Sequence, residues 1–198
     1  MFKYMEFRVT LQRFARIACC FVAILVAGPL HAQQPANAPA QKNGIVFLFT
    51  GWVAPWLDSI QGTGMAQVAQ RVQARGVKVV LSDPADWEKV FANYMASGEQ
   101  QDAIAIVGFS LGANAAQAMA LRFQGEGQAV QTVVTVDGNG LLPVGSNIRN
   151  AVNYYVYGDR LQPSGNFTGK LRNVDANRID QGAGGLGHMT LSVYAALQ

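Results

Sequence analysis

Residues 108–112 read Gly-Phe-Ser-Leu-Gly and separate two segments of opposite conformational preference. The preceding residues 103–107, Ala-Ile-Ala-Ile-Val, are apolar and partly β-branched, which predicts a buried strand. The following residues 113–120, Ala-Asn-Ala-Ala-Gln-Ala-Met-Ala, are mostly strong helix formers. A strand that turns directly into a helix needs small residues on both sides of the turn, and it lifts the central serine to the helix N-terminus. We therefore expect Ser110 at the carboxyl end of a buried strand.

The alternation of strand and helix continues along the chain from residue 45. Runs that predict strands are separated by amphipathic or alanine-rich runs that predict helices near 65–74, near 85–96, after 112 and from about 190. The predicted strands are 45–49, 77–81, 103–107, 132–136, 152–157 and a short one near 171–174. Strands that are apolar on both faces predict a sheet covered on each side. The expected fold class is α/β, a three-layer sandwich with a mostly parallel sheet of about six strands in one domain, residues 43–198.

The first 32 residues have the composition of a targeting segment. A basic start is followed by the apolar run 17–28, and Ala32 ends the segment ahead of the polar residues 33–42. This pattern predicts a signal peptide cleaved near Ala32, a flexible linker over 33–42, and a secreted or periplasmic protein. The alternative is a retained membrane anchor, for which the apolar run is shorter than the roughly 20 residues of a bilayer span.

Removal of that segment changes the charge and the cysteine content of the chain. It leaves 11 basic and 11 acidic residues, and it takes away Cys19 and Cys20, the only cysteines. Because the remaining chain has no net charge, we do not expect nucleic acid as a partner. We also do not expect stable insertion of the mature chain into a membrane. With one histidine and no cysteine left, we expect no bound metal and no cofactor. The oligomeric state stays open.

His188 is the only histidine beyond residue 32. It lies near the C-terminus, after the last predicted strand, and follows the glycine-rich segment 182–187. Where a serine occupies a strand-to-helix turn of this kind, the order along the chain is serine, acid, histidine. Ser110 is therefore a candidate nucleophile, and His188 is the candidate general base.

Two aspartates compete for the third position. Asp137 ends the strand predicted after the Ser110 helix, and Asp159 follows the next predicted strand. Both belong at the carboxyl edge of the sheet, where a carboxylate could orient the histidine and stabilise its charged form. We favour Asp137 and keep Asp159 as the alternative. If Ser110 attacks a carbonyl group, the oxyanion that forms would be bound by two backbone N–H groups. We expect these to be the N–H groups of Leu111 and Trp52, and Gly51 is the alternative to Trp52.

Five segments together resemble a family of small bacterial α/β-hydrolases of lipase and thioesterase type: 64–70, 107–114, 133–137, 147–155 and 187–190. They occur in the family's order and span most of residues 45–198. The resemblance implies an α/β-hydrolase fold without a large cap domain, and it carries Ser110, Asp137 and His188 onto the catalytic triad. The chain departs from the family at two positions: Phe109 stands where the family often has His, and Gly138 stands where it often has Pro. These departures concern the preferred substrate more than the reaction.

The expected function is that of a serine hydrolase, which would cleave a carboxylic ester or thioester through an acyl-enzyme. Asp137 comes only 27 positions after Ser110, and His188 comes 51 positions after Asp137, so little chain is left for a cap over the site. The substrate would be a small-molecule or lipid-like acyl ester. The alternative is a non-catalytic protein of the same fold that binds a ligand or a component of the cell envelope.

Overall fold

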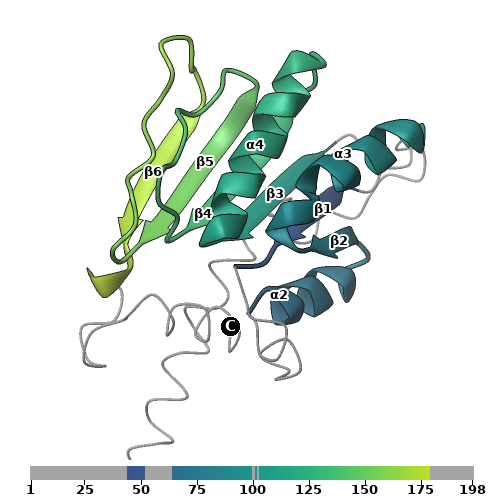
Figure 1. Ribbon diagram of the computed structural model, residues 1–198, viewed down its shortest axis with the longest axis horizontal. Coiled ribbons are helices and arrows are strands. Elements are labelled where there is room, and N and C mark those ends of the chain that lie inside the picture. Colours follow the sequence, from purple (N-terminus) through teal and green to yellow (C-terminus); the bar gives the residue numbers. More distant parts are fainter. Residues whose placement is uncertain (1–43, 52–63, 100, 102, 179–198) are drawn as a thin grey trace, which may run out of the picture.

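The computed structural model describes residues 44–51, 64–99, 101 and 103–178. Strands and helices alternate through these residues, as Figure 1 shows. In chain order they are β1 (Ile45–Phe49), α2 (Gly64–Gln73), β2 (Lys78–Ser82), the 3-10 helix η1 (Pro84–Asp86), α3 (Trp87–Ala96), β3 (Ile104–Phe109), α4 (Leu111–Gly125), β4 (Val130–Val136), β5 (Ile148–Tyr155), β6 (Lys170–Asp175) and the 3-10 helix η2 (Ala176–Arg178).

The six strands form one sheet in the order β2-β1-β3-β4-β5-β6, and each neighbouring pair is parallel. The chain moves outward from β1 to β2, returns to β3 on the other side of β1, and then proceeds strand by strand to β6. All carboxyl ends therefore lie at one edge of the sheet, the lower edge in Figure 1. The winding reverses between β1 and β3, and ligands of open α/β sheets bind at such a reversal.

Helices cover both faces of the sheet. Side chains of β1 alternate, with Phe47 in the cluster that α3 and α4 cover and Leu48 in the cluster that α2 covers. We call these the α4 face and the α2 face; α3 and α4 lie in front of the sheet in Figure 1. The three-layer α/β fold with about six strands is confirmed, and the sheet is parallel throughout. Between Gly64 and Arg178, the described residues contain only the elements of this sheet and its helices.

An aromatic cluster fills the α4 face beside β1. The ring of Phe123, from α4, lies 4.9 Å from that of Phe91, 5.7 Å from that of Tyr94 and 6.2 Å from that of Phe47, centroid to centroid. The pairs with Phe91 and Tyr94 are edge-to-face, which aromatic rings prefer to a direct stack. The cluster joins α3, α4 and β1 into one core, and so it supports the strand-to-helix turn that α4 begins.

Neither connection around β5 contains a helix in the described residues. The connection from β4 to β5 packs against α4 instead. Amide side chains of α4 form hydrogen bonds with the backbone groups of this connection. Gln117, only 4% exposed, donates to the carbonyl of Leu142 (2.6 Å) and accepts from its N–H (2.8 Å). Buried backbone groups need partners, and these amides provide them without a helix. An isolated parallel bridge between Val144 and Pro163 joins this connection to the one that follows β5.

Strand β5 differs most from its predicted bounds. It begins at Ile148, four residues before the apolar run predicts, because Ile148 and Asn150 already pair with Val130 and Thr132 of β4. The polar side chains of Arg149 and Asn150 bond the side chain and the carbonyl of Gln131. The strand ends at Tyr155, two residues early, because the next N–H groups turn to Asp137. The other predicted strands lie within two residues of the observed ones at each end.

The predicted signal peptide, linker and last helix lie outside the described residues. None of the helices in the described part of the chain combines the length and hydropathy that a membrane span requires.

Candidate active site

Ser110 alone makes the turn between β3 and α4. The strand ends at Phe109 and the helix begins at Leu111. Ser110 has φ 54° and ψ −120°, a backbone conformation that residues other than glycine rarely adopt. Its N–H donates to the carbonyl of Val136 (2.8 Å), and its own carbonyl accepts from the N–H of Ala113 (2.9 Å). The strained backbone is thus held on both sides, by β4 and by the first turn of α4.

The two glycines of the turn are required by close backbone contacts. A Cβ atom on Gly108 would lie 1.9 Å from the carbonyl oxygen of Gly112. A Cβ atom on Gly112 would lie 2.3 Å from the carbonyl oxygens of both Phe49 and Thr50. The close approach that the sequence predicts at both glycines is confirmed, and it presses the start of α4 against the ends of β3 and β1.

The N-terminus of α4 offers backbone donors beside Ser110. Leu111 is the first residue of the helix, so its N–H has no carbonyl partner within the helix, and the helix dipole favours negative charge there. Gly51 follows β1 at the same edge, where a Cβ atom would lie 3.3 Å from the Cβ of Ser110. Trp52, the residue predicted to supply the second N–H, lies outside the described residues.

Asp137 follows β4 next to Ser110. Phe109 pairs with Val136 in the register of β3 and β4, so Ser110 and Asp137 come at matching positions one residue later. Asp137 is 1% exposed and has φ 50°, and its N–H continues the ladder by donating to the carbonyl of Tyr154 (2.7 Å). Ser110 and Asp137 are thus the two residues with positive φ, glycines aside, in the described chain.

Three backbone donors hold the Asp137 carboxylate. Its Oδ1 accepts from the N–H groups of Val156 (2.8 Å), Tyr157 (3.0 Å) and Gly158 (2.7 Å), which form a cradle at the end of β5. Bonds from N–H groups to a carboxylate are stronger than bonds between neutral groups, so the cradle stabilises the anion and fixes its direction. Gly158 has to be a glycine, because a Cβ there would lie 2.5 Å from the carbonyl oxygen of Gly138.

Asp159 makes different contacts. It is exposed, its Oδ2 accepts from the N–H of Gly140 (2.6 Å), and its own N–H donates to the carbonyl of Gly138 (2.9 Å). It caps the turn that follows Asp137. His188 lies outside the described residues, so the choice between the two aspartates as the acid stays a prediction.

Sequence reasoning missed the cradle and the contacts of Asp159. It extended β5 to Tyr157, although Gly158 and Asp159 next to one another are a turn signal. The cradle depends on the N–H groups of three successive residues, which carry no side-chain pattern. On α4, the side-chain amide of Asn114 donates to the carbonyls of residues 139 and 140, and that of Gln117 donates to the carbonyl of Leu142. In the sequence both residues belong to a helix-forming run that gives no sign of these contacts.

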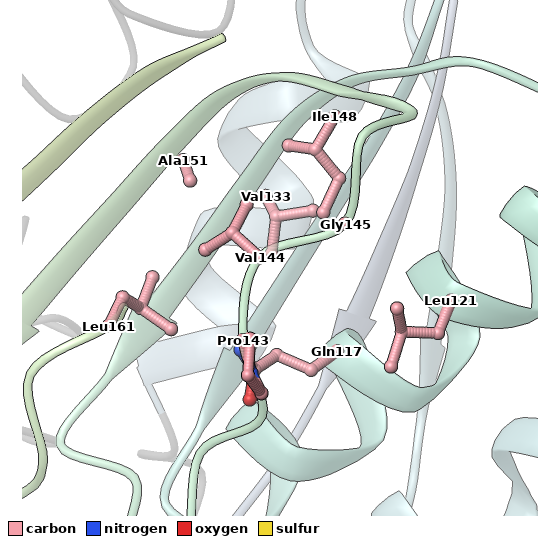
Figure 2. A pocket seen from close by; sticks show the side chains of 9 residues that line it. All are labelled: Gln117, Leu121, Val133, Pro143, Val144, Gly145, Ile148, Ala151 and Leu161. Atoms are coloured by element: carbon pink, nitrogen blue, oxygen red, sulfur yellow. The ribbon is translucent and has the colours of Figure 1, made fainter. Parts of the chain in front are cut away.

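The described residues contain no cluster of three histidine, cysteine, aspartate or glutamate side chains that could hold a metal ion. Figure 2 shows a cavity between α4, β4, β5 and residues 143–145, with Gln117 and Leu121 projecting toward it from the helix. Its volume of about 10 Å³ is about that of one water molecule. Neither Ser110 nor Asp137 lines it, and it is too small for a substrate.

Comparisons with known proteins find matches among solved structures alone. No family model matches the chain, and no curated protein matches it. Among solved structures, the chain is similar to a protein from Xanthomonas campestris pv. campestris whose assignment as a hydrolase of the alpha/beta superfamily is itself provisional. The two share 15% sequence identity with a TM-score of 0.44, over 78% of this chain and 96% of the other. At that level the likeness assigns neither family nor activity.

Proposed function

We propose that this protein is a serine hydrolase that cleaves a carboxylic ester or thioester through an acyl-enzyme. The observation that carries the proposal is the backbone of Ser110, with φ 54° and ψ −120°, held at the N-terminus of α4 where a side chain at Gly108 or Gly112 cannot fit. A strained residue at a functional position is maintained only by surrounding structure. Ser110 follows β3 at the carboxyl edge, where α/β sheets bind ligands, and this position supports the proposal.

In the proposed reaction, the Oγ of Ser110 attacks the acyl carbonyl carbon while His188 accepts the hydroxyl proton. The N–H groups of Leu111 and Trp52 bind the oxyanion of the tetrahedral intermediate. His188 then returns the proton to the leaving alcohol or thiol as its bond to the acyl carbon breaks. Water, deprotonated by His188, attacks the acyl-enzyme, which releases the carboxylic acid and restores the Ser110 hydroxyl.

Asp137 is the acid of the proposed triad. It lies at the position that matches Ser110 on the neighbouring strand, and three N–H groups hold its Oδ1. A fixed carboxylate would keep His188 in the tautomer that accepts a proton from serine, and it would stabilise the imidazolium that forms.

A small-molecule or lipid-like acyl ester suits this edge of the sheet as a substrate. Leu111 is 51% exposed directly after Ser110, and Tyr157 is 75% exposed in the cradle of Asp137. Exposed apolar side chains beside a nucleophile favour an acyl chain over a charged group. We also propose that residues 1–32 direct the protein to the periplasm or the exterior, with cleavage near Ala32.

The experiment is labelling of the purified full chain with a fluorophosphonate probe, which reacts with activated serines. We expect labelling of the wild type, loss of labelling in Ser110→Ala, and a rate in His188→Ala lower by about three orders of magnitude. Ser146→Ala is the matched control, because Ser146 is exposed at the opposite, amino edge of the sheet. Labelling that persists in a folded Ser110→Ala variant would refute the nucleophile. A wild type that is not labelled would favour the non-catalytic binding protein instead.

A further inference from the structure

We propose that Asp159 is a positioning residue: together with Asn114 it clamps the turn formed by residues 138–140, and so it holds Asp137 in place beside Ser110. The inference rests on the proposed function, because it assigns to Asp159 a task in aligning the proposed triad and not membership of it.

One side of the clamp comes from Asp159. Its carboxylate accepts from the N–H of Gly140 and its N–H donates to the carbonyl of Gly138, so it binds both ends of the turn. Its carbonyl in turn accepts from the side-chain amide of Asn153 (2.7 Å), a fully buried residue of β5. The Asn153 amide is itself fixed by the hydroxyl of Thr135 on β4 (2.9 Å). Asp159 is therefore tied to the middle of the sheet, although its side chain is exposed.

The other side of the clamp comes from α4, the helix that begins directly after the proposed nucleophile. The side-chain amide of Asn114 donates to the carbonyls of Asn139 (2.8 Å) and Gly140 (3.3 Å). Asn114 lies one helical turn after Ser110 on α4. The turn is thus joined to α4 on one side and, through Asp159, to β5 on the other.

The clamped turn touches both Asp137 and its cradle. Gly138 follows Asp137 directly, and a Cβ atom on Gly138 would lie 2.7 Å from the Cβ of Ala113 in the first turn of α4. The Gly158 end of the cradle lies against the carbonyl of Gly138. A shift of the turn would therefore move the Asp137 carboxylate relative to Ser110, and a displacement of about 1 Å in a catalytic arrangement can lower a rate about a hundredfold.

The clamp needs a hydrogen-bond acceptor on residue 159 and no charge. Asparagine keeps an acceptor oxygen for the N–H of Gly140, whereas alanine removes it. A triad acid behaves differently, because the amide of asparagine leaves the histidine in the wrong tautomer. The pair Asp159→Asn and Asp159→Ala therefore separates the positioning role from the catalytic one.

The test is the saturation kinetics of fluorophosphonate labelling with the full chain, which gives the limiting rate kinact and the half-saturating probe concentration KI. For Asp159→Ala we expect kinact to fall about tenfold with KI within twofold of wild type. Asp159→Asn should restore kinact to within threefold of wild type. Asp83→Ala is the matched control, because the exposed Asp83 carboxylate also accepts from a backbone N–H, that of Ala85 (2.9 Å), but there it caps η1 after β2. If Asp159→Ala does not fold, Asn114→Ala breaks the other side of the clamp and should lower kinact at least threefold.

The outcomes separate this inference from the proposed function. If the wild type labels at Ser110 and neither Asp159→Ala nor Asn114→Ala lowers kinact threefold, the clamp is refuted and the hydrolase stands. If Asp159→Asn loses as much kinact as Asp159→Ala, Asp159 acts through its charge and the positioning role is wrong. If the wild type is not labelled at all, the proposed function fails and this inference fails with it.

Discussion

Gly108→Ala adds one methyl group at the tightest point of the Ser110 turn. The new Cβ would lie 1.9 Å from the carbonyl oxygen of Gly112, 2.2 Å from its carbonyl carbon and 2.6 Å from the nitrogen of Ala113. All three are backbone atoms, so no side chain can rotate away. To relieve the clash, the start of α4 has to move away from β3, which also disturbs the contact of Gly112 with the carbonyls of Phe49 and Thr50.

The expected loss of folding free energy is about 4 kcal/mol. Extra methyl groups in packed cores cost about 1–3 kcal/mol when side chains share the strain. Here rigid backbone has to move, which places the cost at the upper end of single-residue effects. For a chain of this size that loss lowers Tm by about 8–16 °C.

Urea unfolding, followed by circular dichroism and by tryptophan fluorescence, measures the difference in unfolding free energy between Gly108→Ala and the wild type. Gly125→Ala is the matched control, because a Cβ there meets no atom within 4 Å at the end of α4. Alanine is the better helix former, so this control should gain about 0.5–1 kcal/mol. A Gly108→Ala variant that unfolds cooperatively within 1 kcal/mol of wild type would refute the argument from close contact.

Two further predictions concern the carboxylate and the core. Asp137→Asn keeps an oxygen for the three N–H groups of the cradle, so we expect nearly wild-type Tm but a fluorophosphonate labelling rate about four orders of magnitude lower at neutral pH; a loss of less than tenfold would show that Asp137 is not the acid. Phe123→Ala removes a fully buried ring that contacts three others and should destabilise the fold by about 3–5 kcal/mol in urea unfolding. Leu142→Ala, at a side chain 45% exposed, should cost under about 1 kcal/mol, and equal losses in the two variants would contradict the assignment of the core.

The α/β fold and the turn at Ser110 follow from the order of residue types along the chain. Apolar runs of strand length alternate with helix-forming runs, and such runs can bury their side chains only in a parallel sheet with helices on both faces. Gly-x-Ser-x-Gly between a strand and a helix specifies its turn locally, because the glycines exclude side chains where the two elements meet. These features depend on residues close together in the chain, so the pattern of residue types is enough to predict them.

The contacts at the end of β5 depend instead on how the strands are arranged in space. The apolar run 152–157 predicts strand to its last residue, yet the N–H groups of Val156 and Tyr157 leave the ladder for the Asp137 carboxylate. Nor could the sequence reveal that Asp159 binds the turn after Asp137, since both aspartates follow strands that end at one edge of the sheet. Backbone N–H groups are the same in every residue except proline. Their partners are therefore set by which chain segments the sheet brings together, and the residue types do not record them.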